Sequence, residues 1–152
     1  AKFRTVTVRP DVFSAGRVYF CEHGTPELVW RPEWQSHANG TSSMPEFVTV
    51  SRSPAQEAEA FAKLLGGTVA NNAVTFDGGA LTVLSVDQYR ERYGDLASSM
   101  GGRASIFGAL VFKTNHRAQL ADLATDGIRV QGMSGRTLVR VDAFDAVLEF
   151  VD

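Results

Sequence analysis

The same order of predicted elements occurs twice in this sequence, and this repeat constrains the fold more than any single motif. A predicted strand over 47–50 is followed by a helix and then by three short strands. The same order recurs in the last third of the chain. There Leu123 corresponds to Phe61 on the apolar stripe of the helix, about sixty residues later. A strand-helix-strand-strand-strand unit that occurs twice predicts an α+β chain made of two equivalent modules.

The helix of the first unit has a start signal and a stop signal. Ser53 is placed to cap the free amides, Pro54 suits the first helical position, and Gln56 completes a capping box. Gly66-Gly67 ends the helix. The apolar stripe consists of Ala58, Phe61, Leu64 and Leu65. Three strands are then predicted near 68–70, 73–76 and 80–84.

The second unit follows a short predicted helix over 86–93 and a flexible stretch over 98–102. Its first strand is the apolar run 106–112, and a helix with Leu120, Leu123 and Ala124 on its inward side is expected to end at Gly127. Its remaining strands are predicted near 128–131, 136–141 and 146–151. The charged run 90–92 is interpreted as the solvated face of the short helix.

The first 43 residues show no helical period. Three short strands are predicted around 3–8, 17–22 and 28–31, separated by turn-rich residues. The small, polar segment 38–43 is expected to be a linker. Because the chain begins directly with a strand pattern, its start is interpreted as truncated.

Composition narrows the classes of function. A chain of 152 residues with 44% hydrophobic content can bury one adequate core. A net charge of -2 provides no general cationic surface, so nucleic-acid binding is not expected. Cys21, the only cysteine, cannot form an internal disulfide, which favours a reducing compartment. No apolar run approaches the roughly 20 residues of a membrane span, so a cytoplasmic protein without a membrane role is expected.

Two features carry a resemblance to a known superfamily. The segment 19–35, followed by His37-Ala38-Asn39-Gly40, resembles the segment that closes the first domain of bacterial glyoxalase-like proteins with two tandem domains. The duplicated element order resembles the vicinal oxygen chelate superfamily. The resemblance implies paired β-α-β-β-β modules with curved mixed sheets around a cavity. It further implies that 1–43 holds the last strands of a preceding module plus a linker, and that 44–152 is a glyoxalase-like domain with modules over about 45–86 and 104–152.

The resemblance also implies four positions for metal ligands, on the first and last strand of each module. Glu149 matches the position on the last strand of the second module, where Val83 stands in the first. Counting back from the helix caps places Glu46 and Phe107 at the other two positions. Alignment by strand hydrophobicity shifts this register by one residue, which turns a strand side chain to the opposite face.

At most two of these four positions can bind metal, so the standard four-ligand site is expected to be degenerate. No cofactor is assigned with certainty, although a divalent ion (Zn, Fe, Mn, Ni or Mg) bound by Glu46 and Glu149 stays open, with His116 as a further ligand. Glu149 and His23 are the candidate catalytic residues. The alternative for the segment around His23 is an aromatic strand that packs on a neighbouring domain.

Three functions remain open at this point. The first is a protein that binds a small organic molecule in a cavity between the modules, lined by Val83, Phe107, Phe112 and Val147 with Glu149 at its tip. The second is a metal-dependent lyase, isomerase or dioxygenase that acts on an oxygen-rich small molecule. The third is a structural or dimerising half of a longer protein. A homodimer through the N-terminal strands or the sheet edges is expected, since unpaired strands favour pairing with another copy.

Overall fold

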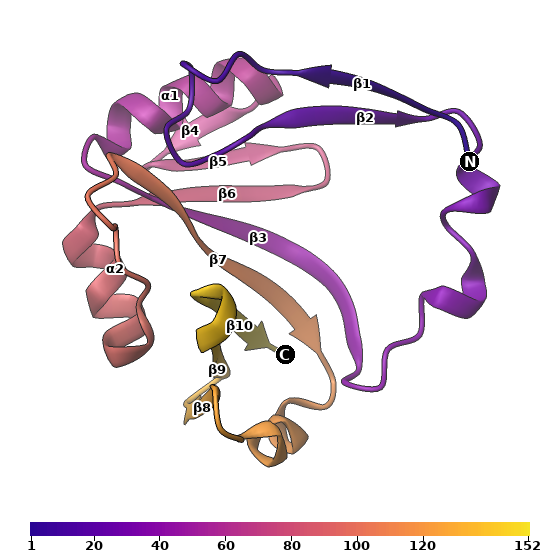
Figure 1. The fold of residues 1–152 in the computed structure, drawn as a ribbon, viewed down its shortest axis with the longest axis vertical. Coiled ribbons are helices and arrows are strands. Elements are labelled where there is room, and N and C mark those ends of the chain that lie inside the picture. The colour runs from indigo at the N-terminus through magenta and orange to yellow at the C-terminus, as the bar shows by residue number, and fades with distance from the viewer.

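The computed structural model describes all residues 1–152, and its core is one mixed sheet of eight strands. The strand order is β4-β5-β6-β3-β7-β10-β9-β8 (Figure 1). The first module contains β3 (Thr41–Ser51), α1 (Pro54–Leu65), β4 (Thr68–Ala70), β5 (Ala73–Phe76) and β6 (Gly79–Leu84). The second contains β7 (Ser105–Thr114), the 3₁₀ segment η4 (Arg117–Leu123), β8 (Ile128–Met133), β9 (Arg136–Val141) and β10 (Ala146–Val151). The connection holds α2 (Val86–Tyr93) and η3 (Gly94–Leu96).

The two modules are built alike and are joined at their first strands. In each module the first and last strands are parallel neighbours, β3 with β6 and β7 with β10, and the other pairings are antiparallel. The antiparallel pairing of β3 with β7 then fuses the modules into one sheet. The predicted α+β class with two paired modules is therefore confirmed.

The start of α1 differs in detail from the prediction. The helix begins at Pro54 and ends before Gly66, whose φ of +67° is the left-handed conformation that glycine adopts without cost. The Ser53 side chain, however, makes no capping hydrogen bond. The capping box lies instead at α2, where Ser85 and Gln88 bond reciprocally to each other's backbone amides. No helix in this fold combines the length and the apolar character needed to cross a lipid bilayer.

The sequence predicts a helix in the second module at the position that corresponds to α1. The structure has no α-helix there, so this prediction is wrong. Residues 117–123 form the 3₁₀ segment η4, which ends well before Gly127. Of the predicted inward stripe only Leu120 is buried, while Leu123 is 47% exposed. A single buried anchor does not hold a long amphipathic helix against a sheet, since packing of an apolar face supplies most helical stability.

The two faces of the sheet carry different elements. Phe47 and Leu110 are cross-strand partners on β3 and β7, and Phe47 packs against the apolar cluster under α1. Phe112, two residues beyond Leu110, packs with Leu120 of η4, so that α1 and η4 share one face, called here the α1 face. The opposite face, called the α2 face, packs Val48, Val50 and Val111 against Tyr89 and Tyr93 of α2.

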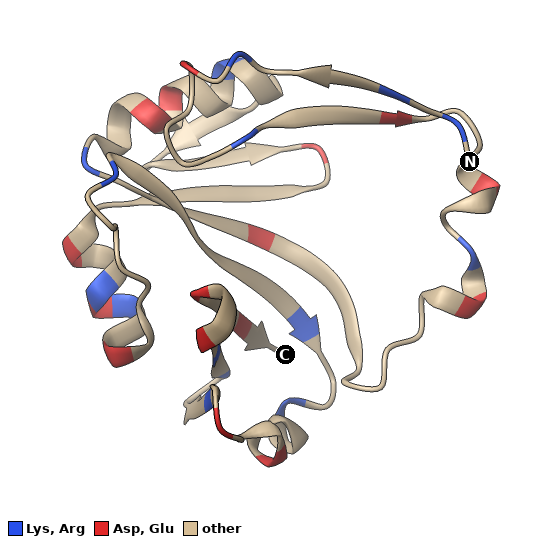
Figure 2. Ribbon diagram, viewed as in Figure 1, with Lys and Arg blue, Asp and Glu red and all other residues tan.

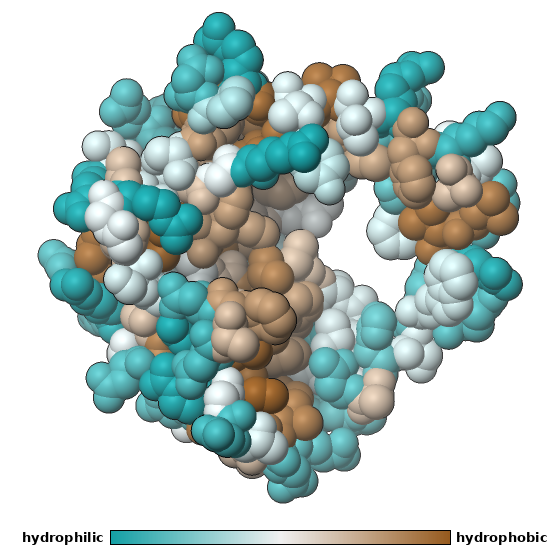
Figure 3. All heavy atoms as spheres, viewed as in Figure 1, coloured by the Kyte–Doolittle hydropathy of each residue, from teal (hydrophilic) through white to brown (hydrophobic).

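The N-terminal residues form an arm that extends from the body. β1 (Phe3–Thr7) and β2 (Tyr19–His23) pair only with each other, and all but one of their residues are exposed. Figure 3 shows an opening between this arm and the body of the molecule. The predicted strand over 28–31 is absent, because Pro26 and Pro32 each begin a 3₁₀ turn, Pro26–Leu28 and Pro32–Trp34.

The base of the arm is part of the hydrophobic core. Phe13 is only 4% exposed and stacks on Phe61 of α1, with the two ring centroids 4.1 Å apart. Ala15 is equally buried, and the Ser14 hydroxyl lies 2.8 Å from that of Ser105. The turn between the two arm strands therefore packs on the same chain's own domain.

Candidate functional site

The two predicted carboxylate ligands lie close together on the α2 face. Glu46 on β3 and Glu149 on β10 are both cross-strand partners of Val111 on the intervening strand β7, so their side chains project from the same face. Figure 2 shows the acidic position within β3 and the basic positions on α2. The sheet register thus brings together two residues that are about a hundred positions apart in the sequence.

An arginine of α2 lies between the two carboxylates. The Arg92 guanidinium donates to both oxygens of Glu46 at 3.0 and 2.9 Å, and its Nε donates to Oε2 of Glu149 at 3.0 Å. The Tyr93 hydroxyl donates to the same Glu149 oxygen at 2.8 Å. The other Glu149 oxygen accepts from Arg136 of β9 at 3.2 Å. All four carboxylate oxygens therefore already accept hydrogen bonds from the protein.

Burial and charge act in opposite directions on this cluster. Burial alone raises the pKa of Glu46, but the hydrogen bonds and the charge of Arg92 outweigh it and hold the pKa below its ordinary value. Burial raises the pKa of Tyr93 far above its ordinary range, and the neighbouring Glu149 adds to the effect. Tyr93 is therefore a neutral hydrogen-bond donor, while Glu46 and Arg92 form a charged pair.

These residues do not fit a divalent metal ion. A catalytic centre usually has about three protein ligands and an open position. Here Glu46 and Glu149 are the only candidate ligands that converge, and Arg92 lies between them. No group of three or more His, Cys, Asp or Glu side chains in the structure is placed to hold a metal ion. The donor set is that of an arginine-carboxylate cluster.

The predicted histidine sites lie elsewhere. His23 is on the arm, where its ring stacks on Trp30 with centroids 5.5 Å apart and meets Phe3 edge-on at 5.2 Å. His116 precedes η4, and its Nδ1 lies 3.3 Å from the Ala38 carbonyl oxygen. Neither is a partner of Glu46 or Glu149. The surroundings of His23 are those of an aromatic packing cluster on an exposed strand.

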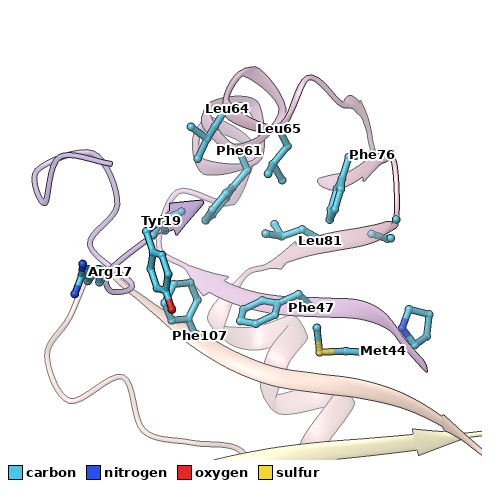
Figure 4. A pocket seen from close by; sticks show the side chains of 15 residues that line it. Arg17, Tyr19, Met44, Phe47, Phe61, Leu64, Leu65, Phe76, Leu81 and Phe107 are labelled. Atoms are coloured by element: carbon cyan, nitrogen blue, oxygen red, sulfur yellow. The ribbon is translucent and has the colours of Figure 1, made fainter. Parts of the chain in front are cut away.

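The principal apolar pocket is on the α1 face. Its volume is about 390 Å³, and 11 of its 15 lining residues are hydrophobic. Figure 4 shows Phe61 and Leu65 of α1 above Phe47 and Leu81 of the sheet, with the pocket between the helix and the strands. A cavity of this size with a mostly apolar lining is typical of a small-molecule site.

Polar groups are confined to one end of this pocket. Tyr19, the first residue of β2, and Arg17, two residues before it, lie at that end, and Met44 of β3 lies at the other (Figure 4). Arg17 is the only lining residue with a charge. Its guanidinium lies over the Tyr19 ring, 5.2 Å from the centroid, and donates to the Thr7 hydroxyl at 3.3 Å. The arm therefore supplies the single cation of an otherwise apolar pocket.

A smaller apolar hollow of about 240 Å³ continues from the pocket across the sheet. Phe47 and Phe107 line both and meet edge-to-face, with ring centroids 5.3 Å apart. Of the four predicted cavity residues, Phe107 lines both spaces and Val147 lines the smaller one. Val83 is fully buried in the core beneath α1, and Phe112 packs in the cluster around Leu120. Glu149 lies on the opposite face of the sheet.

A further hollow, of about 840 Å³, is of a different kind. It lies beside η3 and the loop after it, and only four of its 12 lining residues are hydrophobic. Its arginines, Arg52 and Arg90, share the space with Asp95. A hollow lined mostly by polar residues gives a ligand less apolar burial, so the pocket on the α1 face is the better candidate.

Sequence reasoning missed the residue at the centre of the charged cluster. The run 90–92 was interpreted as a solvated helix face, but the Arg92 side chain is only 23% exposed, so that interpretation is wrong for this residue. A signal was present in the apolar spacing of Val86, Tyr89 and Tyr93, at helical intervals of three and four. That stripe turns α2 toward the sheet and places Arg92 over the inner strands β3 and β10.

The comparisons with known proteins give similarity at the level of fold only. No protein-family profile matches the sequence, and no curated protein sequence does. Methylmalonyl-CoA epimerase from Mycobacterium tuberculosis is similar with a TM-score of 0.49 and 9% identity, over 76% of this chain and 91% of that chain. A variant of the Streptomyces coelicolor epimerase in complex with 2-nitronate-propionyl-CoA gives 0.42 and 17%, over 72% and 95%.

At these identities and TM-scores, neither a site residue nor an activity is transferred to this chain. The assignment to an α+β fold with a mixed sheet rests on the strand order and pairing of this chain.

Proposed function

We propose that this protein binds a small, mostly apolar organic molecule with an anionic end group, in the pocket between α1 and the sheet. The observation that carries the proposal is the lining of this pocket, which is apolar except for one arginine at its end. Burial of apolar ligand surface would provide most of the binding free energy. The proposal keeps the first of the three functions named above, but at the α1 face.

The lining of the pocket has no carboxylate, histidine or cysteine for acid-base catalysis. Arg17 and Tyr19 have the only polar side chains in its lining. The carboxylates that could take part in chemistry, Glu46 and Glu149, project from the other face. We therefore propose binding at this pocket and not turnover.

The anionic end group is proposed from the position of Arg17. Its guanidinium is exposed and has one hydrogen bond to a neutral hydroxyl, so donors remain free for a ligand. Guanidinium groups match the planar geometry of a carboxylate. The apolar part of such a ligand would lie between Phe61 and Phe47, with its carboxylate near Arg17.

Isothermal titration calorimetry with decanoate and 1-decanol tests this proposal. Both probes have the same apolar chain, so both are expected to bind, and decanoate is expected to bind about tenfold more tightly because of the charge-assisted hydrogen bond. If neither probe binds to the wild-type protein, the proposed function is wrong. If both bind with equal affinity, the apolar pocket is supported and the role of Arg17 is not.

Matched variants locate the binding site. Leu65→Trp fills the pocket and is expected to abolish binding of both probes. Leu123→Trp makes the same change on η4, away from the pocket, and is expected to leave binding unchanged. Arg17→Gln is expected to weaken decanoate binding about tenfold and to leave 1-decanol binding as it is. Equal loss of probe binding in Leu65→Trp and Leu123→Trp would show that the probes do not bind in this pocket.

A further inference from the structure

We infer that the Arg92 guanidinium occupies the place between Glu46 and Glu149 that a divalent cation would need. The cluster on the α2 face is therefore a structural ion-pair cluster and not a metal centre. The resemblance to the vicinal oxygen chelate superfamily implies a metal at this position, and the residues present do not fit one. The inference concerns the opposite face from the proposed ligand pocket and does not depend on it.

The first support is the occupancy of the carboxylate oxygens. Three of the four accept hydrogen bonds from Arg92, namely both oxygens of Glu46 and Oε2 of Glu149. The fourth, Oε1 of Glu149, accepts from Arg136. A metal ion shared by the two carboxylates would have to lie in the space between them, which the Arg92 guanidinium fills.

The second support is the charge balance of the cluster. Two carboxylates face two arginines, so the formal charges of Glu46, Glu149, Arg92 and Arg136 cancel. The Glu149 side chain is only 4% exposed, and the other three are between 22% and 24% exposed. A divalent cation added to this neutral, largely desolvated group would leave two uncompensated positive charges there, which is costly.

The third support is the position of Arg92 in the chain. α2 lies in the connection between the modules, and Arg92 of this helix contacts Glu46 of the first module and Glu149 of the second. The backbone carbonyl of the same residue accepts a hydrogen bond from Arg136 at 3.0 Å. The guanidinium therefore bridges three elements, as a structural metal ion would, but it cannot dissociate from the protein.

Removal of Arg92 should consequently create a binding site for a divalent cation, which the native protein lacks. Without this side chain, both oxygens of Glu46 lose their donors, Oε2 of Glu149 keeps only the Tyr93 hydroxyl, and the cluster has a net charge of about -1. Carboxylate oxygens are the donors that Mn²⁺ and Mg²⁺ prefer. Removal of Arg136 changes the net charge by the same amount but leaves the three oxygens bound to Arg92, so it is the matched control.

The experiment compares the wild-type protein, Arg92→Ala and Arg136→Ala, each purified with chelator and then titrated with MnCl₂. Bound manganese is measured by the loss of the free Mn²⁺ signal in electron paramagnetic resonance, and stability is measured by thermal melting. At about 1 mM Mn²⁺, Arg92→Ala is expected to bind one ion and to gain about 3–5 °C in Tm. The wild-type protein and Arg136→Ala are expected to bind none and to show no shift.

Two further measurements make the outcome decisive. The double variant Arg92→Ala/Glu149→Gln is expected to lose the manganese binding gained by the single variant. If Arg92→Ala does not fold without metal, recovery of its circular dichroism spectrum on addition of Mn²⁺ supports the inference. Stoichiometric manganese binding by the wild-type protein overturns the inference. The inference is also overturned if Mn²⁺ neither binds to Arg92→Ala nor changes its Tm or its circular dichroism spectrum, whether or not this variant folds without metal. Equal binding by Arg136→Ala also overturns it.

Discussion

Arg92 of α2 and Glu46 of β3 form a bidentate ion pair, in which two guanidinium nitrogens donate to the two carboxylate oxygens at 3.0 and 2.9 Å. Paired hydrogen bonds of this kind fix both planar groups in one orientation. The same guanidinium also reaches Glu149 on β10. The Arg92 guanidinium therefore holds α2 against the strands of both modules. Its contribution to the free energy of unfolding can be measured by substitution of either carboxylate.

Loss of the Glu149 charge should cost more stability than loss of the Glu46 charge. Glu149 is 3% exposed and accepts hydrogen bonds from Arg92, Arg136 and Tyr93. Glu149→Gln is expected to lower the free energy of unfolding by about 3 kcal/mol, because it leaves buried positive charge uncompensated. Glu46→Gln, at a more accessible position, is expected to cost about 1–2 kcal/mol. Urea denaturation measures both, and the reverse order would contradict the assignment of Glu149 as the more deeply buried carboxylate of the cluster.

The stability of the wild-type protein should contain an acid-sensitive part that belongs to Glu46. The pKa of Glu46 in the folded state lies below its ordinary value of 4.5, so the unfolded state binds protons first as the pH falls. The stabilising contribution is fully present above pH 4.5 and is lost as the pH falls through the lowered folded-state pKa. Glu46→Gln is expected to flatten this part of the curve of unfolding free energy against pH. Parallel curves for the two proteins below pH 4.5 would show that Arg92 does not stabilise the charged form of Glu46.

The Tyr93 hydroxyl should contribute to stability through a single hydrogen bond. The ring is almost completely buried, and the hydroxyl donates to Glu149 at 2.8 Å. Tyr93→Phe keeps the ring and is expected to cost about 1–3 kcal/mol, because a buried carboxylate oxygen loses a donor. Tyr19→Phe, on the exposed arm, is the control and is expected to change stability by less than about 0.5 kcal/mol. Equal effects of the two changes would argue against the buried hydrogen bond.

Gly108 should be intolerant of a methyl group. It lies where the pairing of β3 with β7 shifts register, and a Cβ there would come within 2.7 Å of a Val50 methyl carbon and 3.0 Å of the Tyr89 ring. Gly108→Ala is expected to lower the free energy of unfolding by about 1–3 kcal/mol through overpacking. Gly132 of β8 has no heavy atom within 4 Å of an added Cβ, so Gly132→Ala is expected to be neutral or slightly stabilising. Thermal melting of the two variants compares them directly.

Phe13 should matter to the domain although it precedes both modules. It is 4% exposed and stacks on Phe61 of α1. Phe13→Ala is expected to cost about 3–5 kcal/mol, the range for truncation of a buried aromatic ring. Phe144→Ala, at a position 81% exposed, is expected to have little effect. A small effect at Phe13 would mean that the first forty residues are an independent attachment and not part of the core.

The strand pattern and the order of the elements could be predicted from the sequence for a local reason. The period of two in the strands and the stop at Gly66 are encoded by neighbouring residues, and the structure has each of the predicted strands after residue 45. Prediction failed where the local signal was incomplete, as at residues 117–123, where one buried leucine supports only a 3₁₀ segment. It also failed at 28–31, where prolines on both sides favour turns.

The register at Glu46 and Phe107 could not be settled from the sequence. The structure has an irregularity between Val48 and Thr49 of β3, where the partner on β7 changes from Ala109 to Phe107 and passes over Gly108. Such a bulge reverses the inward and outward faces of the residues beyond it. Counting along β7 therefore gives the wrong face on one side of the bulge, whichever starting point is chosen.

The sequence by itself determined the two-module α+β architecture, because hydrophobic period and helix signals are local and occur twice. It also identified Glu46 and Glu149 as the pair of carboxylates to examine. Only the tertiary structure decided what those carboxylates do, since their partner Arg92 is brought to them by the packing of Tyr89 and Tyr93 against the sheet. A charge that looks solvated in a short helical run becomes the centre of a buried cluster through contacts that no local pattern encodes.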